Sequence, residues 1–213
     1  MSNQQRDSYQ AIARWYDILI EPLNRKLKLM MLRFARPEPG AVVLDVGCGT
    51  GTLLELYLDA GCEAWGLDAS QAMLAVARRR LGDRAQLRDG DATAMPFPDE
   101  RFDWVAFSMV LHEMSPDTRL AVLAEARRVL RRQGHILVVD YHDAPVRRAQ
   151  GWLLKGMTTA IERMAGGDHW AGYRHFMAHG AMDGLAADAQ LEVERQRVVG
   201  DGNLAISVLR PRA

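Results

Sequence analysis

The sequence has few cysteines, no excess of either charge and no long apolar run. Only two cysteines occur among 213 residues, so a disulfide framework is not expected. We expect instead the reduced thiols of a cytoplasmic protein. Lys plus Arg equals Asp plus Glu at 27 each, which argues against a broad nucleic-acid-binding surface. No stretch approaches the roughly 18 apolar residues of a membrane span, and the polar residues 1–7 lack a signal-peptide core. Peripheral membrane contact stays open.

Alternating strand and helix patterns run from residue 41 to residue 141. The predicted strands are 41–46, 63–67, 85–89, 102–109 and 135–141, and the predicted helices are 52–60, 70–81 and 116–131. In the last helix, Leu120, Leu123 and Leu130 are predicted to face the core. This alternation indicates βαβ units and a parallel sheet.

The two ends of the chain and one internal segment differ from this alternation. Residues 8–35 are predicted to be helical, with an interruption near Pro22. The alternation stops between about 143 and 190, and residues 191–199 and 204–209 are typical of an antiparallel hairpin. We predict a single domain over 1–213. Its predicted parts are an N-terminal helical lid (1–36), a cofactor-binding core (41–142), a substrate-side insertion (143–190) and a C-terminal hairpin (191–213).

A glycine-rich loop, Asp45-Val46-Gly47-Cys48-Gly49-Thr50-Gly51, follows the first predicted strand. Glycines at alternate positions let the backbone turn sharply and let a ligand approach closely. A dinucleotide fingerprint would need a glycine at Thr52, and a phosphate-binding P-loop would need Gly-Lys-Ser/Thr. The missing glycine at position 52 disfavours a nicotinamide-dependent oxidoreductase, and the P-loop motif is also missing.

Acidic residues follow the next two predicted strands. Asp68 ends the second strand and Asp91 follows the third. Ligands of open α/β sheets bind outside the carboxyl ends of the strands, where these residues and the glycine loop all fall. Each element alone also suits a simple turn or a helix N-cap, such as Ser70.

In this order, the motifs resemble those of the class I S-adenosylmethionine-dependent methyltransferases, in the ubiquinone/menaquinone-type, small-molecule branch. The resemblance implies a Rossmann-like α/β fold with a mostly parallel seven-stranded sheet, an antiparallel C-terminal hairpin and a helical lid. It implies S-adenosylmethionine as the cofactor and S-adenosylhomocysteine as its product. The glycine loop would hold the methionine part, Asp68 the ribose hydroxyls, and Asp91 the adenine amino group. The cofactor-binding residues implied in this way are Tyr16, Asp45, Gly47, Gly49, Gly51, Asp68, Ala69, Met73, Asp91, Ala92 and Ser108.

Candidates for catalysis and substrate binding come from polar residues near the same ends of later strands. A general base contributes when the acceptor carries a proton, and His112, Asp140 and His142 are the candidates. Substrate-binding candidates in the insertion are Trp152, His169, Tyr173 and His175. Each could instead cap a helix or pack in the core. No tight metal-ligand spacing such as His-Glu-x-x-His occurs, so no metal is predicted.

The acceptor class is inferred by elimination. The segment Ser108-Met109-Val110-Leu111 stands where base-methylating relatives have an Asn/Asp-Pro-Pro-aromatic motif, and no basic tail is visible. We therefore predict a small, apolar acceptor of quinol, phenolic or lipid-like kind, with no nucleic acid. The apolar stripe that includes Leu154, Met157 and Ile161 is either core or the lining of a substrate pocket. A cofactor-binding module without catalysis remains an alternative, and the oligomeric state is not predicted.

Overall fold

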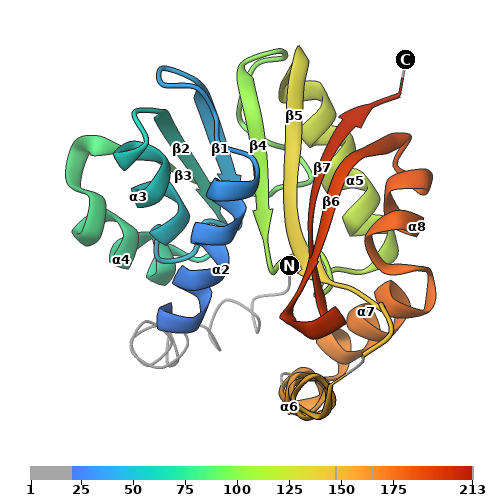
Figure 1. The fold of residues 1–213 in the computed structure, drawn as a ribbon. Coiled ribbons are helices and arrows are strands. Elements are labelled where there is room, and N and C mark those ends of the chain that lie inside the picture. Colours follow the sequence, from blue (N-terminus) through green and yellow to red (C-terminus); the bar gives the residue numbers. More distant parts are fainter. Residues whose placement is uncertain (1–20, 147, 165, 213) are drawn as a thin grey trace. The chain divides into compact units, whose positions relative to one another are not determined.

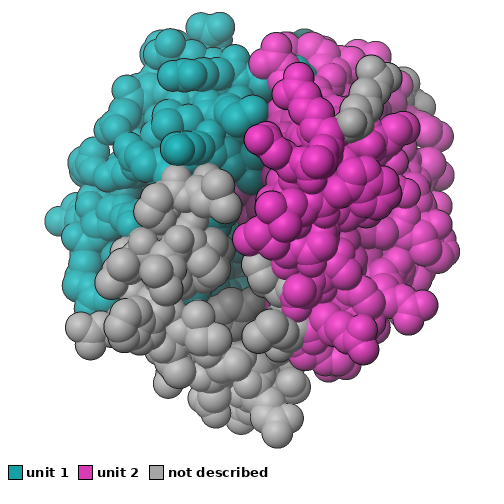
Figure 2. Space-filling model, turned by 60° about the horizontal axis from the view of Figure 1, so that its bottom comes forward, with its two compact units in different colours: residues 1–106, 129–134 teal, residues 107–128, 135–213 magenta. Residues whose placement is uncertain are grey.

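The computed structural model describes residues 21–146, 148–164 and 166–212. The chain divides into two compact units, coloured separately in Figure 2. The first unit comprises residues 1–106 and 129–134, and the second comprises residues 107–128 and 135–213. The strands of the described residues form one sheet in the order β3-β2-β1-β4-β5-β7-β6 (Figure 1).

The elements follow the chain in a simple alternation before a helical segment and a final hairpin. The strands are β1 (Val42–Val46), β2 (Glu63–Asp68), β3 (Gln86–Asp89), β4 (Phe102–Ser108), β5 (Leu130–Tyr141), β6 (Leu191–Val199) and β7 (Leu204–Pro211). The helices are α2 (Glu21–Phe34), α3 (Thr52–Asp59), α4 (Gln71–Leu81), α5 (Pro116–Val129), α6 (Ala149–Met164), α7 (Gly167–Ala178) and α8 (Ala181–Asp188). The predicted residues 8–20, Tyr16 among them, lie outside the described residues.

The first unit is organised around β1, whose residues Val43, Leu44 and Val46 are buried. β1 pairs in parallel with β2, and β2 pairs in parallel with β3. Such a run of apolar residues is expected in a strand that helices cover on both faces. Because the three strands are parallel, their carboxyl ends meet at one edge, where the glycine loop begins.

The second unit ends in the predicted hairpin. β7 pairs antiparallel with both β5 and β6, and β6 has the predicted bounds. The turn between β6 and β7 is a short 3-10 segment, Gly200–Gly202, in which Asp201 has a positive φ of 56°. The predicted fold class, a seven-stranded α/β sheet with an antiparallel C-terminal hairpin, is confirmed.

The prediction of a helix over 116–131 was wrong at its end. α5 ends at Val129, and β5 begins at Leu130, five residues before the predicted strand. Leu130 is buried and suits the apolar pattern of either element. The choice is made by contacts distant in sequence: Arg101 N–H donates to the Val129 carbonyl at 2.8 Å, and the Arg131 guanidinium donates to the Asp103 carboxylate at 2.7 Å.

The prediction that Leu120 faces the core was also wrong. Its side chain is 37% exposed, whereas Leu123 is fully buried as predicted. The buried stripe of α5 runs through Val122, Leu123, Ala126 and Val129, and Leu120 lies at its margin.

The segment 143–190, for which no regular alternation was predicted, consists of α6, α7 and α8. α7 packs against both α6 and α8, as Figure 1 shows in orange. Among the described residues, no helix has the length and apolar character needed to cross a membrane.

Candidate functional site

The glycine loop after β1 forms a tight bend in the first unit. Gly47, Gly49 and Gly51 have positive φ angles of 72°, 53° and 81°, which side chains rarely adopt. A Cβ at Gly51 would lie 2.8 Å from Leu81 of α4, so the loop packs directly against that helix. Among the described residues, a Cβ at Gly49 would meet nothing within 4 Å. The loop is therefore closely packed on one side and open at Gly49, as a backbone that holds a ligand must be.

Asp68 fixes this bend from the end of β2. Its Oδ2 accepts a hydrogen bond from Gly49 N–H, and its Oδ1 accepts one from Ser70 N–H, each at 2.8 Å. Burial raises the pKa of Asp68, and the two backbone hydrogen bonds oppose that rise. Each carboxylate oxygen has a further lone pair, so both can still accept a hydroxyl hydrogen. Ser70 itself caps α4 by accepting from Met73 N–H at 3.3 Å.

Asp91 lies close to Asp68 because the ends of β2 and β3 are joined. Gly90 N–H donates to the Asp68 carbonyl at 3.3 Å. Asp91 is exposed, and its Oδ1 accepts from both the N–H and the hydroxyl of Thr93. The glycine bend, Asp68 and Asp91 thus occupy adjoining strand ends within the first unit.

The other predicted cofactor-binding residues of the first unit surround these groups. Asp45 is buried in β1, and Met73 is buried in the first turn of α4. Ala69 and Ala92 are half-buried beside Asp68 and Asp91 in the chain. Ser108, at the end of β4, belongs to the second unit.

Cys48, inside the glycine loop, is buried. Its backbone N–H and that of Gly47 both donate to the Leu67 carbonyl, at 3.2 and 2.8 Å. Burial, together with the nearby carboxylates of Asp68 and Asp45, raises the pKa of the Cys48 thiol well above its usual value.

The second unit contains a buried pair of two predicted catalytic candidates, His112 and Asp140. His112 Nδ1 lies 2.6 Å from Asp140 Oδ1. The Asp140 carboxylate also accepts from the backbone N–H groups of Leu111, His112 and Tyr141. Four donors therefore converge on one buried carboxylate, which suits its charged form.

Glu162 of α6 extends this pair into a cluster. His112 Nε2 lies 3.4 Å from Glu162 Oε1 and 3.8 Å from Glu113 Oε1, at ion-pair distance without hydrogen-bond geometry. Burial lowers the pKa of His112, but Asp140, Glu162 and Glu113 outweigh burial and raise this pKa to about 10. His112 is therefore an imidazolium at neutral pH, and an imidazolium cannot accept a proton.

Tyr141 completes the cluster by donating its hydroxyl hydrogen to Glu162 Oε1 at 2.9 Å. Burial and the adjacent Glu162 raise the pKa of Tyr141, so it keeps its proton. The rings of Tyr141 and His112 pack edge to face with centroids 4.6 Å apart. The cluster joins the ends of β4 and β5 to α6.

Arg119 fixes the loop that carries His112. Its guanidinium is buried and donates to the carbonyls of Leu111, Met114 and Gly172 at 2.8, 2.8 and 3.2 Å. A Cβ at Gly172 of α7 would lie 2.9 Å from three carbonyl oxygens of this same loop. Only glycine lets α7 approach so closely.

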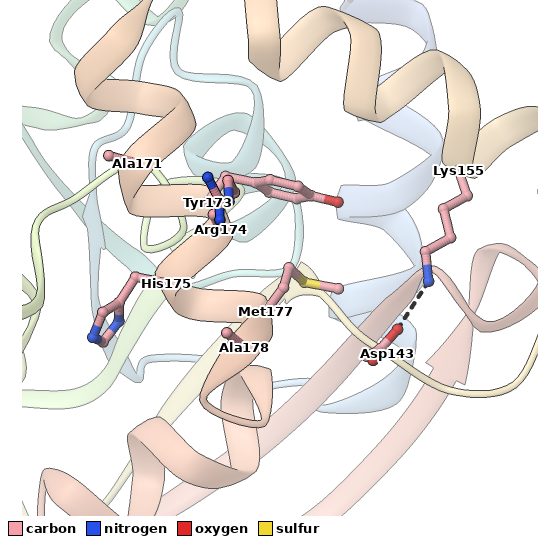
Figure 3. A pocket seen from close by; sticks show the side chains of 8 residues that line it. All are labelled: Asp143, Lys155, Ala171, Tyr173, Arg174, His175, Met177 and Ala178. Carbon is pink, nitrogen blue, oxygen red and sulfur yellow. Dashed lines mark hydrogen bonds and ion pairs between the residues drawn. The ribbon is translucent and has the colours of Figure 1, made fainter.

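A surface pocket of about 610 Å³ lies beside α6 and α7 (Figure 3). Its lining includes two substrate-binding candidates, Tyr173 and His175, together with Lys155, Arg174 and Met177. Lys155 is paired with Asp143 at 2.9 Å. His169 and Trp152 do not line the pocket. His169 lies 4.0 Å from Glu113, and Trp152 is exposed on α6.

His142 is the remaining catalytic candidate, and it follows β5. Its backbone N–H donates to the Asn203 carbonyl at 2.8 Å. Its ring Nδ1 is buried and has no hydrogen-bond partner among the described residues. Within those same residues, no group of three or more His, Cys, Asp or Glu side chains could hold a metal ion.

Glu162 and Arg119 are among the residues of this unit that the sequence did not suggest. Glu162 is the one acidic residue of α6, and its place beside apolar residues was the only signal for a buried partner. Arg119 gave no such signal, because its partners are backbone carbonyls of the loop at 111–114 and of α7.

Comparison with known proteins identifies the segment that carries the glycine bend. Residues 43–134 match the family described as "Methyltransferase domain". This segment contains the glycine loop, Asp68 and Asp91. The match supports the predicted enzyme class and the predicted cofactor, S-adenosylmethionine, and it does not favour the oxidoreductase alternative.

Curated relatives narrow the resemblance to the ubiquinone/menaquinone type, as predicted. A demethylmenaquinone methyltransferase of Renibacterium salmoninarum is 38% identical over 125 residues, which are 59% of this chain and 52% of that protein. The ubiquinone/menaquinone biosynthesis C-methyltransferase UbiE of Paraburkholderia phytofirmans is 34% identical over 144 residues, 62% of this chain and 58% of that protein. The chain thus spans about half the length of the curated relatives it matches.

Solved structures support the fold. The 1,6-didemethyltoxoflavin-N1-methyltransferase of Burkholderia thailandensis, solved with bound 1,6-didemethyltoxoflavin and S-adenosylhomocysteine, matches with a TM-score of 0.68. The match covers 98% of this chain and 88% of that one at 16% identity. At 16% identity, this match supports the fold and nothing further.

Proposed function

We propose that this protein transfers a methyl group from S-adenosylmethionine to a small, apolar acceptor of the quinol, phenolic or lipid-like kind. The methyltransferase domain and the names of the quinone-methylating relatives support the reaction and the acceptor class. One observation carries the cofactor assignment: Asp68 holds the Gly49 N–H at a bend that is open toward a ligand.

The chain's own groups fit the parts of this cofactor. The two oxygens of Asp68 suit the vicinal hydroxyls of the ribose, since a carboxylate accepts one hydrogen bond from each. Gly47, Gly49 and Gly51 offer a backbone without side chains to the methionine part. Asp91 is assigned to the adenine amino group, and Met73 to packing on the adenine ring. Tyr16, Asp45, Ala69, Ala92 and Ser108 keep the cofactor-binding roles that the resemblance implies.

When bound, the cofactor supplies a methyl group on a positively charged sulfur. The acceptor provides the electron pair of the new bond, the carbon–sulfur bond breaks, and its electron pair stays on the sulfur. The protein's contribution is alignment and exclusion of water, which can reach about 7–11 kcal/mol. An acceptor that carries a proton must also lose it to a base or to water.

We assign different roles to the three catalytic candidates. Asp140 is a positioning residue because its carboxylate already accepts from four donors. His112 is a positioning residue because it is already protonated at neutral pH. His142 is the proposed base, since its Nδ1 has no hydrogen-bond partner among the described residues. The proposed acceptor-binding residues remain Tyr173, His175 and His169. For Trp152 we propose a different role, as part of the exposed surface of α6.

The test has two parts. Calorimetric titration with S-adenosylhomocysteine measures cofactor binding. Transfer of a labelled methyl group is then measured with a panel of short-chain quinols and phenols, with single nucleosides for comparison. Transfer to a quinol or a phenol supports the proposal. Tight binding without transfer to any acceptor would favour the non-catalytic module, and absence of binding would overturn the function altogether.

The remaining expectations rest on the sequence. We propose that the protein is cytoplasmic, acts without nucleic acid, and uses residues 1–213 as one domain with a lid. The N-terminal lid, residues 1–36, falls partly outside the described residues.

A further inference from the structure

Helix α6 presents apolar side chains outward. Trp152, Leu153 and Met157 are 62%, 67% and 55% exposed. Gly156 and Ala160 are also exposed and share their stripe at helical spacing. We call these five residues the outer face of α6. An ordinary surface helix turns its apolar stripe toward the core, so this face is the reverse of the common arrangement.

The inner side of α6 is held by polar contacts. Glu162 accepts from the Tyr141 hydroxyl at 2.9 Å, and Lys155 pairs with Asp143 at 2.9 Å. The Gly151 carbonyl accepts from the buried Asn203 side chain at 3.0 Å. These contacts fix the rotation of the helix about its axis, so the outer face cannot turn inward without breaking them.

The outer face differs from the rest of the described surface. The other exposed large apolar side chains, Met30, Leu120 and Val198, lie singly on α2, α5 and β6. Scattered residues of this kind are ordinary. Three within six positions of one helix form a patch, and a patch of this kind marks a contact surface.

The charges around the outer face indicate what it contacts. Arg148 directly precedes α6 and Arg163 lies in its last turn, and both are exposed. Glu162, the one acidic residue of α6, is buried. Apolar and aromatic residues flanked by basic ones fit a lipid surface with anionic headgroups, on which a helix of 16 residues lies flat.

We propose that the outer face of α6 docks the protein on anionic phospholipid membranes, with Trp152, Leu153 and Met157 inserted among the acyl chains and Arg148 and Arg163 at the headgroups. This surface is distinct from the cofactor site and does not depend on the proposed reaction. It would, however, bring the protein to the phase in which lipid-like acceptors dissolve.

Co-sedimentation with vesicles tests the proposal. The vesicles contain phosphatidylcholine and phosphatidylglycerol in equal amounts, or phosphatidylcholine alone. We expect the protein to bind the anionic vesicles, and the triple variant W152S/L153S/M157S to bind at least about tenfold more weakly. The double variant L120S/V198S, which changes exposed apolar residues elsewhere in the same unit, is the matched control and should stay within about twofold.

The charge component has its own variant. R148Q/R163Q should lose affinity for the anionic vesicles and show a weaker dependence on salt, because fewer headgroups are neutralised. Its binding to phosphatidylcholine alone should equal that of the unchanged protein.

The proposal is overturned if the unchanged protein does not bind the anionic vesicles or if the triple variant binds as the unchanged protein does. Sedimentation velocity tests the alternative that a second copy of the chain occupies the outer face of α6. A dimer that the triple substitution dissociates, without vesicle binding, would support this alternative and overturn the proposal. Titration with S-adenosylhomocysteine and methyl transfer to a short-chain quinol are measured for every variant. Because both are done without membranes, a failure of docking is distinguishable from a failure of the proposed function.

Discussion

Replacing Asp68 by Asn tests the assignment of the ribose carboxylate most directly. In the structure both carboxylate oxygens accept backbone N–H groups, from Gly49 and from Ser70. An Asn side chain has one oxygen and one NH₂ group, so it must set a donor against one of these donors. The substitution therefore disturbs the glycine bend as well as removing a charge-assisted contact to the ribose.

The magnitude follows from the hydrogen bonds lost. A hydrogen bond to a charged group contributes about 1.5–3 kcal/mol, so the loss of one corresponds to about 10- to 150-fold weaker binding. Asp68→Ala removes both oxygens and should weaken binding by about 10²- to 10⁴-fold if the two losses add. The assay is calorimetric titration with S-adenosylhomocysteine, with the melting temperature recorded to show that the variants are folded.

Asp89→Asn is the matched control. Asp89 is the register partner of Asp68 on β3, and its carboxylate accepts from the exposed Gln71 side chain at 2.9 Å. This substitution removes the same charge from the same strand ends without touching the glycine bend, so affinity should change by less than about threefold. Unchanged affinity in Asp68→Asn, or an equal loss in both variants, would refute the reasoning.

Three further predictions concern the second unit. The pKa of His112 lies near 10 against an ordinary 6.5, so the stability it contributes is complete below about pH 6.5 and is lost as the pH rises toward about 10. Urea unfolding should show this decline, and His112→Gln should flatten it; a decline of the same slope in the variant would disprove the imidazolium. Gly172→Ala should lower the free energy of unfolding by about 1–3 kcal/mol through overlap with three carbonyl oxygens, whereas Gly156→Ala, in open space on α6, should raise it by about 0.5–1 kcal/mol. His142→Gln should lower kcat about 10²- to 10⁴-fold for an acceptor that must lose a proton, with S-adenosylhomocysteine binding unchanged; a kcat that stays the same excludes His142 as the base.

The cofactor side of the molecule was predictable because its signals are local. The glycine bend, Asp68 and Asp91 each follow a strand closely, and parallel pairing then brings strand ends together without further information. The hairpin of β6 and β7 was predictable for the same reason, since its glycine-rich turn lies between two segments with strand-forming residues.

The predictions failed where distant contacts decide between two local patterns. Leu130 fits a helix and a strand equally well, and the pairing of Arg131 with Asp103 decides for the strand. The pairing of Glu162 with Tyr141 likewise joins residues 21 positions apart, and neither local pattern shows which partner Glu162 has. α6 shows the limit of periodicity most clearly: its spacing revealed a helix but gave no indication that the apolar side faces outward.

The buried thiol of Cys48 has a chemical consequence. A sulfonium methyl donor alkylates thiolates readily, and the loop would hold such a donor beside a cysteine. Because only the thiolate is an effective nucleophile, a pKa far above neutrality keeps Cys48 inert toward the donor and toward oxidants. Burial contributes most to this raised pKa, and the carboxylates of Asp68 and Asp45 add to it, so the negative charge that suits the ligand also protects the thiol of the loop from methylation.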